Sequence, residues 1–282
     1  MSDKTTCTSA STGTPVTTQT ICNRPFIAHE HGIGDPLDPF AWNVIEGQLK
    51  EWLEGREVPD QGLSSLCGPA VFFYFLLLVD KNTYKSLVWS LWYHGVANIK
   101  SIQLKPSNAT KHPTSYFKAN NEPKILGLDW MTLASLRDTF NKRIRYKSPD
   151  DETAGITLPH ELIGWLEKIG FKHIETYELD TLANYIQLNA YFTKQDYYVI
   201  SLINTELLQK GNSAFGVIPE HWVVWTSLLR SGKNAIDLNT KLTDIVHLTV
   251  FSWGKNNWSI QSNLPLNKFM LYHKTAFIVK RV

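Results

Sequence analysis

Apolar residues recur at helical spacing through the first two thirds of the chain. Trp42, Ile45, Leu49 and Trp52 lie three or four residues apart, as in a helix with one buried face. The same reasoning predicts helices over residues 40–54, 83–94, 130–141, 157–170 and 179–191. Asp129 directly precedes the third of these and would cap it through its carboxylate.

Strand-like runs dominate the last third of the chain. β-branched and aromatic residues gather in short runs separated by polar connections, which predicts strands over residues 197–203, 221–229, 245–253 and 276–282. The second and third of these would form a hairpin with a long loop. The stretch 95–128 has few periodic features and is expected to be rich in loops. This order predicts an α+β fold, with a helical half packed on an antiparallel sheet.

One segment is apolar around its whole circumference. Residues 71–79 leave no polar face, so we expect a helix enclosed on all sides. The run is too short to span a membrane, which takes about 20 residues. Pro69 fits a first helical turn, so the helix should begin close to Cys67. A thiol there lies beside backbone N–H groups and the positive end of the helix dipole, which favours the reactive thiolate.

Two further residues have the chemistry to assist Cys67. Gln61 lies six residues earlier, where its side-chain N–H could stabilise a developing oxyanion together with the N–H of Cys67. His221 opens a strand-like run and is the expected base. Among the other histidines His247 is the main rival, since it lies on the following strand, while His160 and His173 occupy polar faces of expected helices.

The pattern of Gln61, Gly62, four further residues and Cys67 at a helix start resembles the papain-like cysteine peptidases. The Cys-Gly-Pro-Ala continuation and the later His-aromatic-Val-Val strand are closer to the bacterial branch that includes bacteriocin-leader-processing peptidases. The resemblance implies a papain-like fold with Cys67 as nucleophile, His221 as base and then acid, and Gln61 as oxyanion donor. It also implies a protein or peptide substrate and no cofactor.

The residue that would orient His221 departs from the papain pattern. Phe251-Ser252-Trp253-Gly254 resembles the Asn-Ser-Trp-Gly of papain, except that Phe stands where Asn is expected. Ser252 is the first candidate to accept a bond from the imidazole. Asn256, Asn257 or a backbone carbonyl are the alternatives, and a dyad without a third side chain would also be competent because a thiol ionises readily.

Net charge and the placement of histidines argue against two classes of function, nucleic-acid binding and metal binding. The 282 residues include 28 basic and 26 acidic side chains, giving a net charge of +2, which argues against a nucleic-acid-binding surface. His29-Glu30-His31 has no third ligand nearby and is more typical of a solvated loop than of a metal site.

The first 24 residues differ in composition from the rest. They are rich in Ser and Thr and have no apolar core of a secretory signal peptide, so a disordered leader over residues 1–24 and a catalytic domain over residues 25–282 are expected. Cys7 and Cys22 lie in this leader, where a bridge between them is conceivable only in an oxidising compartment.

These patterns predict a cysteine hydrolase that cleaves a peptide or amide bond. Glutamine deamidation and transglutaminase-like acyl transfer use the same residues and stay open, as does a catalytically silent papain-like binding module. The expected location is the cytoplasm, or outside the cell after export by a specialised secretion system. An exported bacterial effector or toxin of this kind would have an immunity or inhibitor protein as its partner.

Overall fold

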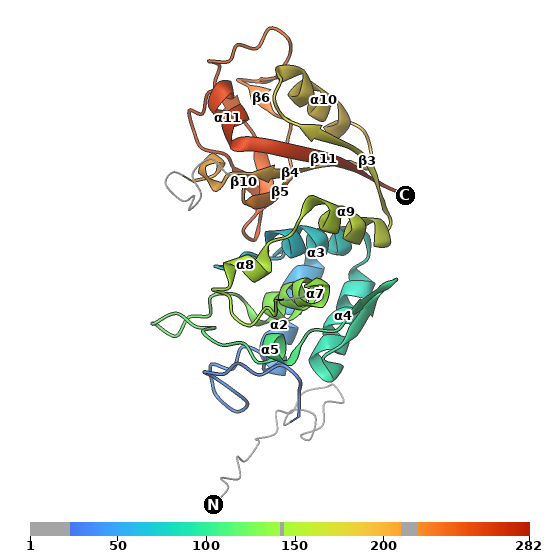
Figure 1. Ribbon diagram of the computed structural model, residues 1–282, viewed down its shortest axis with the longest axis vertical. Helices are drawn as coiled ribbons and strands as arrows, with labels where there is room; N and C mark the ends of the chain where they lie inside the picture. The colour runs from blue at the N-terminus through green and yellow to red at the C-terminus, as the bar shows by residue number, and fades with distance from the viewer. Residues whose placement is uncertain (1–22, 142–143, 210–218) are drawn as a thin grey trace, which may run out of the picture. The chain divides into compact units, whose positions relative to one another are not determined.

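The computed structural model describes residues 23–141, 144–209 and 219–282. The chain forms two compact units that divide between Leu158 and Pro159. The first unit is mainly helical and the second is built on an antiparallel sheet (Figure 1). The expected α+β class is confirmed. Apart from Asn23 and Arg24, the leader expected over residues 1–24 lies outside the described residues, and so do Cys7 and Cys22.

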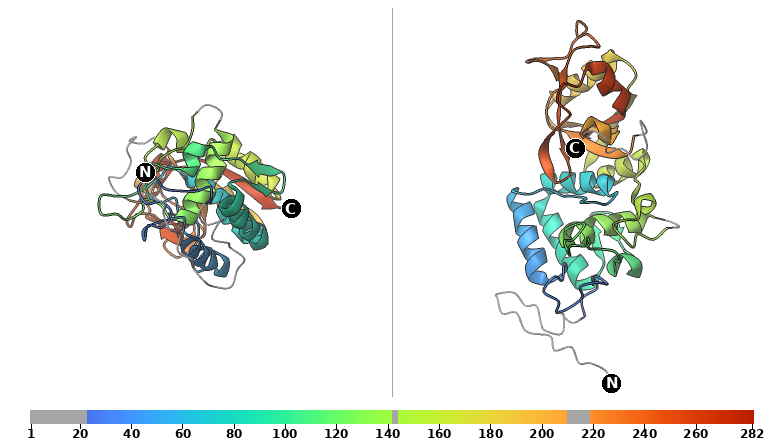
Figure 2. Two further views of the ribbon diagram at one scale, coloured as in Figure 1. Left: turned by 90° about the horizontal axis from the view of Figure 1, so that it is seen from below. Right: turned by 90° about the vertical axis from the view of Figure 1, so that its left-hand side faces the viewer.

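The helical unit is formed by long helices joined by short helical turns and one small hairpin. Its helices are α2 (Trp42–Glu54), α3 (Cys67–Val79), α4 (Lys81–His94), α5 (Asn108–Lys111), α6 (Gly127–Asp129), the π-helical turn η1 (Trp130–Ala134), α7 (Ser135–Phe140) and α8 (Glu152–Gly155). The hairpin consists of β1 (Ala97–Ile99) and β2 (Ile102–Leu104) and falls in the stretch where loops were expected. Helices α2 and α4, blue and teal in Figure 2, lie side by side.

The helix expected to begin after Asp129 begins earlier. Segments α6, η1 and α7 follow one another without a break, and Asp129 lies inside this segment in helical conformation with no capping bond. The prediction that Asp129 is a cap is therefore wrong. The reason is tertiary, because the Gln48 side chain on α2 accepts the N–H of Leu128 at 2.9 Å and satisfies the first turn from outside.

The second unit contains a six-stranded antiparallel sheet of order β10-β9-β5-β4-β11-β3. Its elements in chain order are α9 (Pro159–Lys168), β3 (Phe171–Glu178), α10 (Leu182–Phe192), β4 (Tyr197–Ile203), η2 (Thr205–Leu207), β5 (His221–Trp225), β6 (Arg230–Ser231), β7 (Asn234–Ala235), β8 (Val246–His247), β9 (Thr249–Ser252), β10 (Lys255–Ser259), α11 (Leu266–Tyr272) and β11 (His273–Arg281). Strands β7, β6 and β8 form a separate small sheet.

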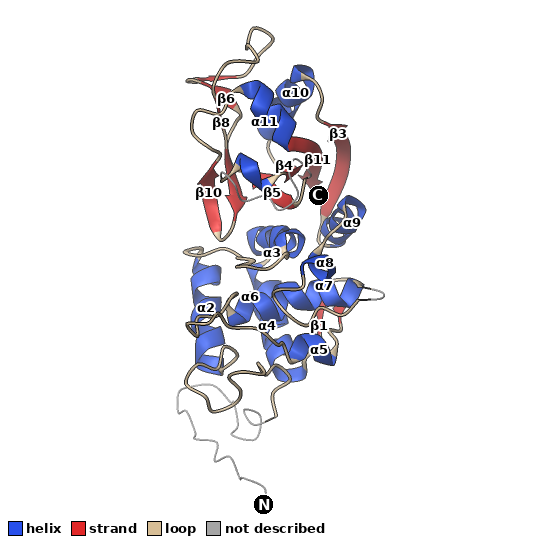
Figure 3. Ribbon diagram, turned by 60° about the vertical axis from the view of Figure 1, so that its left-hand side comes forward, coloured by secondary structure: helices blue, strands red, loops and turns tan. Residues whose placement is uncertain are grey.

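Helices α10 and α11 cover one face of the large sheet (Figure 3). Tyr185, Leu188 and Phe269 from these helices pack in one buried cluster with sheet residues that include Val223 and Val250. Strands β5 and β9 pair antiparallel, as expected for the strand that begins with His221 and the next long one. None of the described helices is both long and apolar enough to cross a membrane.

Candidate active site

The expected site residues are divided between the two units. Gln61 and Cys67 belong to the helical unit, and His221 and Ser252 belong to the sheet unit. Each unit thus carries one half of the proposed chemistry.

Cys67 is the first residue of α3, as the sequence predicts. No side chain caps this helix end, so the sulfur lies at the positive end of the helix dipole, which favours negative charge there. Cys67 is 6% exposed, and most of α3 is buried around its full circumference, with Leu78 exposed near its end. A long buried helix fixes the position of the sulfur.

Gln61 lies in a tight turn immediately before α3. Its Nε2 donates to the carbonyl oxygen of Ser64 at 2.7 Å, and the Ser64 hydroxyl donates back to the Gln61 carbonyl at 2.6 Å. The turn is completed by the N–H of Gly62, which donates to Asp60 Oδ1 at 2.9 Å. Because a carboxamide has two N–H bonds, one remains after the bond to Ser64. Gln61 is largely buried, and its oxyanion role stays a prediction.

His221 and Ser252 meet on one face of the large sheet. His221 is the first residue of β5, Ser252 is the last residue of β9, and the Nε2 atom of His221 lies 2.8 Å from Ser252 Oγ. Phe251 precedes Ser252 on the same strand and therefore faces the opposite side, because side chains alternate along a strand. The predicted contact between His221 and Ser252 is present. Asn256 and Asn257, the alternatives to Ser252, are exposed on β10.

A tryptophan that the sequence did not mark as functional covers the imidazole. The rings of Trp253 and His221 stack with centroids 4.8 Å apart and planes at 25°. Trp253 and Gly254 form the two-residue turn between β9 and β10, and both have positive φ, at 40° and 66°. A bulky residue in the left-handed region costs about 1–2 kcal/mol, so tertiary contacts hold Trp253 there. The adjacent glycine was the available sequence signal for such a turn.

Burial makes His221 a neutral imidazole at physiological pH. The side chain is 3% exposed, and loss of solvation of the charged form lowers its pKa to about 3. A neutral ring can accept a proton, which is the form that a general base requires.

The rival histidines lie in other environments. His160 on α9 and His247 on β8 are exposed. The prediction that His173 lies on a helix is wrong, because it lies on β3, where its Nε2 is 2.9 Å from the Thr176 hydroxyl. His31 pairs with Asp35, while Glu30 accepts the N–H of Tyr116. Within the described ranges, no group of three His, Cys, Asp or Glu side chains is arranged to hold a metal ion.

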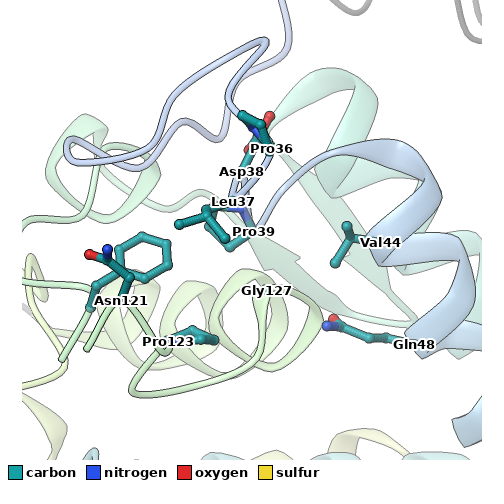
Figure 4. Close-up of a pocket in the computed structure, with 10 residues that line it drawn as sticks. Pro36, Leu37, Asp38, Pro39, Val44, Gln48, Asn121, Pro123 and Gly127 are labelled. Atoms are coloured by element: carbon teal, nitrogen blue, oxygen red, sulfur yellow. The ribbon is translucent and has the colours of Figure 1, made fainter. Parts of the chain in front are cut away.

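A small pocket opens elsewhere in the helical unit (Figure 4). Its lining is mostly apolar and includes Pro36, Leu37, Pro123 and Phe117, but neither Cys67 nor Gln61. The one ionisable side chain of the lining, Asp38, is paired with the buried Arg24. The pocket therefore offers no reactive group.

Searches against protein-family models, curated proteins and solved structures find no match to this chain.

Proposed function

We propose that the chain is a papain-like cysteine hydrolase that cleaves a peptide or amide bond in a protein or peptide substrate. Cys67 is the nucleophile, His221 the base and then the acid, Gln61 the oxyanion donor and Ser252 the residue that orients His221. The observation that carries the proposal is the His221–Ser252 contact, in which a buried imidazole is held at Nε2 and covered by Trp253.

The mechanism depends on which ring nitrogen of His221 is bonded to Ser252. With Nε2–H bonded to Ser252, Nδ1 is the nitrogen that takes the proton from the Cys67 thiol. The sulfur then bonds to the substrate carbonyl carbon, and the carbonyl oxygen becomes an oxyanion stabilised by Gln61 Nε2–H and the backbone N–H of Cys67.

The second half of the cycle restores the enzyme. The carbon–nitrogen bond breaks as Nδ1–H of His221 protonates the leaving amine, which leaves a thioester on Cys67. Water gives a proton to Nδ1 as its oxygen bonds to the thioester carbon. The carbon–sulfur bond breaks, the carboxylic acid is released, and Nδ1–H returns the proton to the sulfur. Glutamine as substrate would release ammonia by the same steps, and an amine in place of water would give acyl transfer.

One observation favours the alternative of a silent binding module. Ser252 is a neutral partner, and burial keeps His221 weakly basic, so this imidazole draws the thiol proton less strongly than one paired with a carboxylate.

Thiol reactivity separates the two candidates. In a Cys7→Ser/Cys22→Ser background, iodoacetamide should alkylate Cys67 faster than a model thiol at pH 6–7, and Cys67→Ala should abolish labelling and hydrolysis while leaving the fold intact. His221→Ala should remove the excess rate. New N-termini in a peptide library would indicate hydrolysis, and ammonia release would indicate deamidation. Labelling of wild type at the rate of the model thiol would establish the silent module instead.

A further inference from the structure

Two stretches of chain contact the segment from Gln61 to Cys67, and we call them its two walls. The first wall is the loop that contains Lys124. The N–H of Leu63 donates to the carbonyl oxygen of Lys124 at 2.9 Å. Gly62 has a φ of 56°, and a Cβ at this position would collide with the same carbonyl oxygen and with Ile125. The backbone of Gly62 and Leu63 therefore packs directly against the backbone of Lys124, and the position of Lys124 determines the position of the Gln61 turn.

The second wall consists of residues 148–157. The Ser65 hydroxyl donates to the carbonyl oxygen of Glu152 at 2.8 Å, and a Cβ at Gly155 would collide with Ser65. A Cβ at Gly68, the second residue of α3, would collide with the side chain of Thr157. This wall therefore contacts the residues on both sides of Cys67.

One ion pair joins the two walls. Lys124 Nζ lies 2.7 Å from Asp150 Oδ1 and 2.6 Å from Asp150 Oδ2, so the ammonium contacts both carboxylate oxygens. The Lys124 side chain is only 16% exposed, against 54% for Asp150. Asp150 is fixed in turn, because its N–H donates to the Ser148 hydroxyl at 3.1 Å and its carbonyl accepts the N–H of Glu152 at 3.1 Å.

We infer that the Lys124–Asp150 ion pair is a clamp that positions the Gln61–Cys67 segment, so that Lys124 and Asp150 are positioning residues for the reaction. The inference rests on the proposed function of Cys67. The clamp acts through its backbone contacts, with Lys124 holding the oxyanion turn and the Asp150 turn holding the helix start. Opening it would let the two walls separate and would loosen the turn that presents Gln61.

The partial exposure of the Lys124–Asp150 pair determines how strongly its removal should change the measured rates. Partly exposed ion pairs are weak, so removing this one should change rates by about two- to five-fold rather than abolish them. Because the pair is electrostatic, 1 M NaCl, where the screening length is about 3 Å, should weaken it in the wild type. The Lys118–Glu122 pair on the same loop, at 3.1 Å, provides a matched control that does not bridge the walls.

The experiment compares Asp150→Asn, Lys124→Met, the charge swap Lys124→Asp/Asp150→Lys and the control Glu122→Gln. Amide hydrogen exchange at Leu63 reports the clamp directly and needs no activity. It should be about two- to five-fold faster in both single variants, recover in the swap, and stay at the wild-type rate in the control. Alkylation of Cys67 and kcat should fall by a similar factor in the single variants with KM unchanged.

The outcomes separate this inference from the function on which it rests. Wild-type exchange at Leu63 in both single variants, or a charge swap that fails to restore protection, would overturn the clamp even if the enzyme is active. Faster exchange at Leu63 in an otherwise unreactive protein would support the clamp and refute the cysteine hydrolase. An equal response of Glu122→Gln would show a general charge effect and would also overturn the clamp.

Discussion

The Nε2 atom of His221 lies 2.8 Å from the Oγ atom of Ser252. In the proposed mechanism the Ser252 hydroxyl accepts the N–H of a neutral imidazole, which places the proton on Nε2 and leaves Nδ1 as the basic nitrogen. A neutral serine thus lies beside the imidazole in this chain, whereas the papain pattern has a carboxamide one position earlier.

Ser252→Ala should lower kcat about five-fold with little change in KM. The expected loss corresponds to one hydrogen bond of about 1 kcal/mol, since the ring is no longer held in the productive orientation. Ser252→Thr keeps the hydroxyl and should retain most of the activity, and Ser259→Ala on the exposed face of β10 serves as the control. Steady-state kinetics on a cleaved peptide provide the measurement, and equal kcat for the Ala and Thr variants would refute the orienting role.

Gln61→Ala should lower kcat by about 10²–10³, because one oxyanion donor is lost from the transition state. KM and the alkylation rate of Cys67 should change little, since neither depends on the oxyanion. Gln61→Glu preserves the shape of the side chain but has no N–H to donate, so it should be as impaired as the Ala variant. Wild-type turnover in Gln61→Glu would exclude the donor role.

Trp253→Ala should raise the pKa of His221 from about 3 toward its ordinary value of 6.5, because burial is the cause of the lowered pKa and Trp253 covers one face of the ring. An NMR titration of the imidazole would measure this shift. Trp258→Ala is the control, since Trp258 packs edge-on against Trp253 and should produce a smaller shift. An unchanged pKa in Trp253→Ala would mean that other groups keep water from His221.

His273 should make the sheet unit labile to acid. It is fully buried among Tyr185, Trp225 and Phe269, neither ring nitrogen has a hydrogen-bond partner among the described residues, and burial lowers its pKa to about 3. The unfolded chain binds a proton below pH 6.5 and the folded chain does not, so stability is lost as pH falls from 6.5 toward 3. At pH 5 the loss is about 2 kcal/mol.

The isosteric variant His273→Phe should remove this loss and melt at higher temperature than wild type at pH 5, with a smaller difference at pH 7. His247→Gln removes an exposed histidine of the same unit and is the control. Parallel melting curves for wild type and His273→Phe across this pH range would contradict the assignment.

Asp129 should have the opposite pH dependence. Its carboxyl group is fully buried, and loss of solvation raises its pKa well above the ordinary 3.8, so the folded state keeps a proton that the unfolded state loses. Stability should therefore fall as pH rises above about 4, by at most about 1.4 kcal/mol per pH unit. Urea denaturation from pH 4 to 8 should show the free energy of unfolding of Asp129→Asn rising relative to that of wild type as pH rises. The control Glu46→Gln, at an exposed position, should show no such trend. A difference between Asp129→Asn and wild type that stays constant with pH would refute a buried neutral acid at position 129.

Local sequence pattern was sufficient for the elements with strong periodicity or strong apolar character. The run after Pro69 predicted α3 and its start at Cys67, and residues 197–203 were predicted with the bounds that β4 has. Strand β3 and helix α11 were missed. Strand β3 lies at a sheet edge and its exposed and half-buried residues do not alternate regularly, so it lacks the period of two, and α11 has only seven residues. The run 245–253 reads as one strand, but it divides into β8 and β9, which pair in different sheets.

The sequence by itself determined the reactive residue types and the elements that carry them, namely a thiol at a buried helix start and a histidine at the start of a strand. Tertiary structure decided which neighbours they have. Alternation along β9 turned Ser252 toward His221 and Phe251 away from it, and the turn that follows placed Trp253 over the ring in a conformation that its own propensity disfavours. Contacts between segments distant in the chain outweigh the local backbone preference of a residue such as Trp253, because their summed stabilisation exceeds the conformational cost of one unfavourable φ.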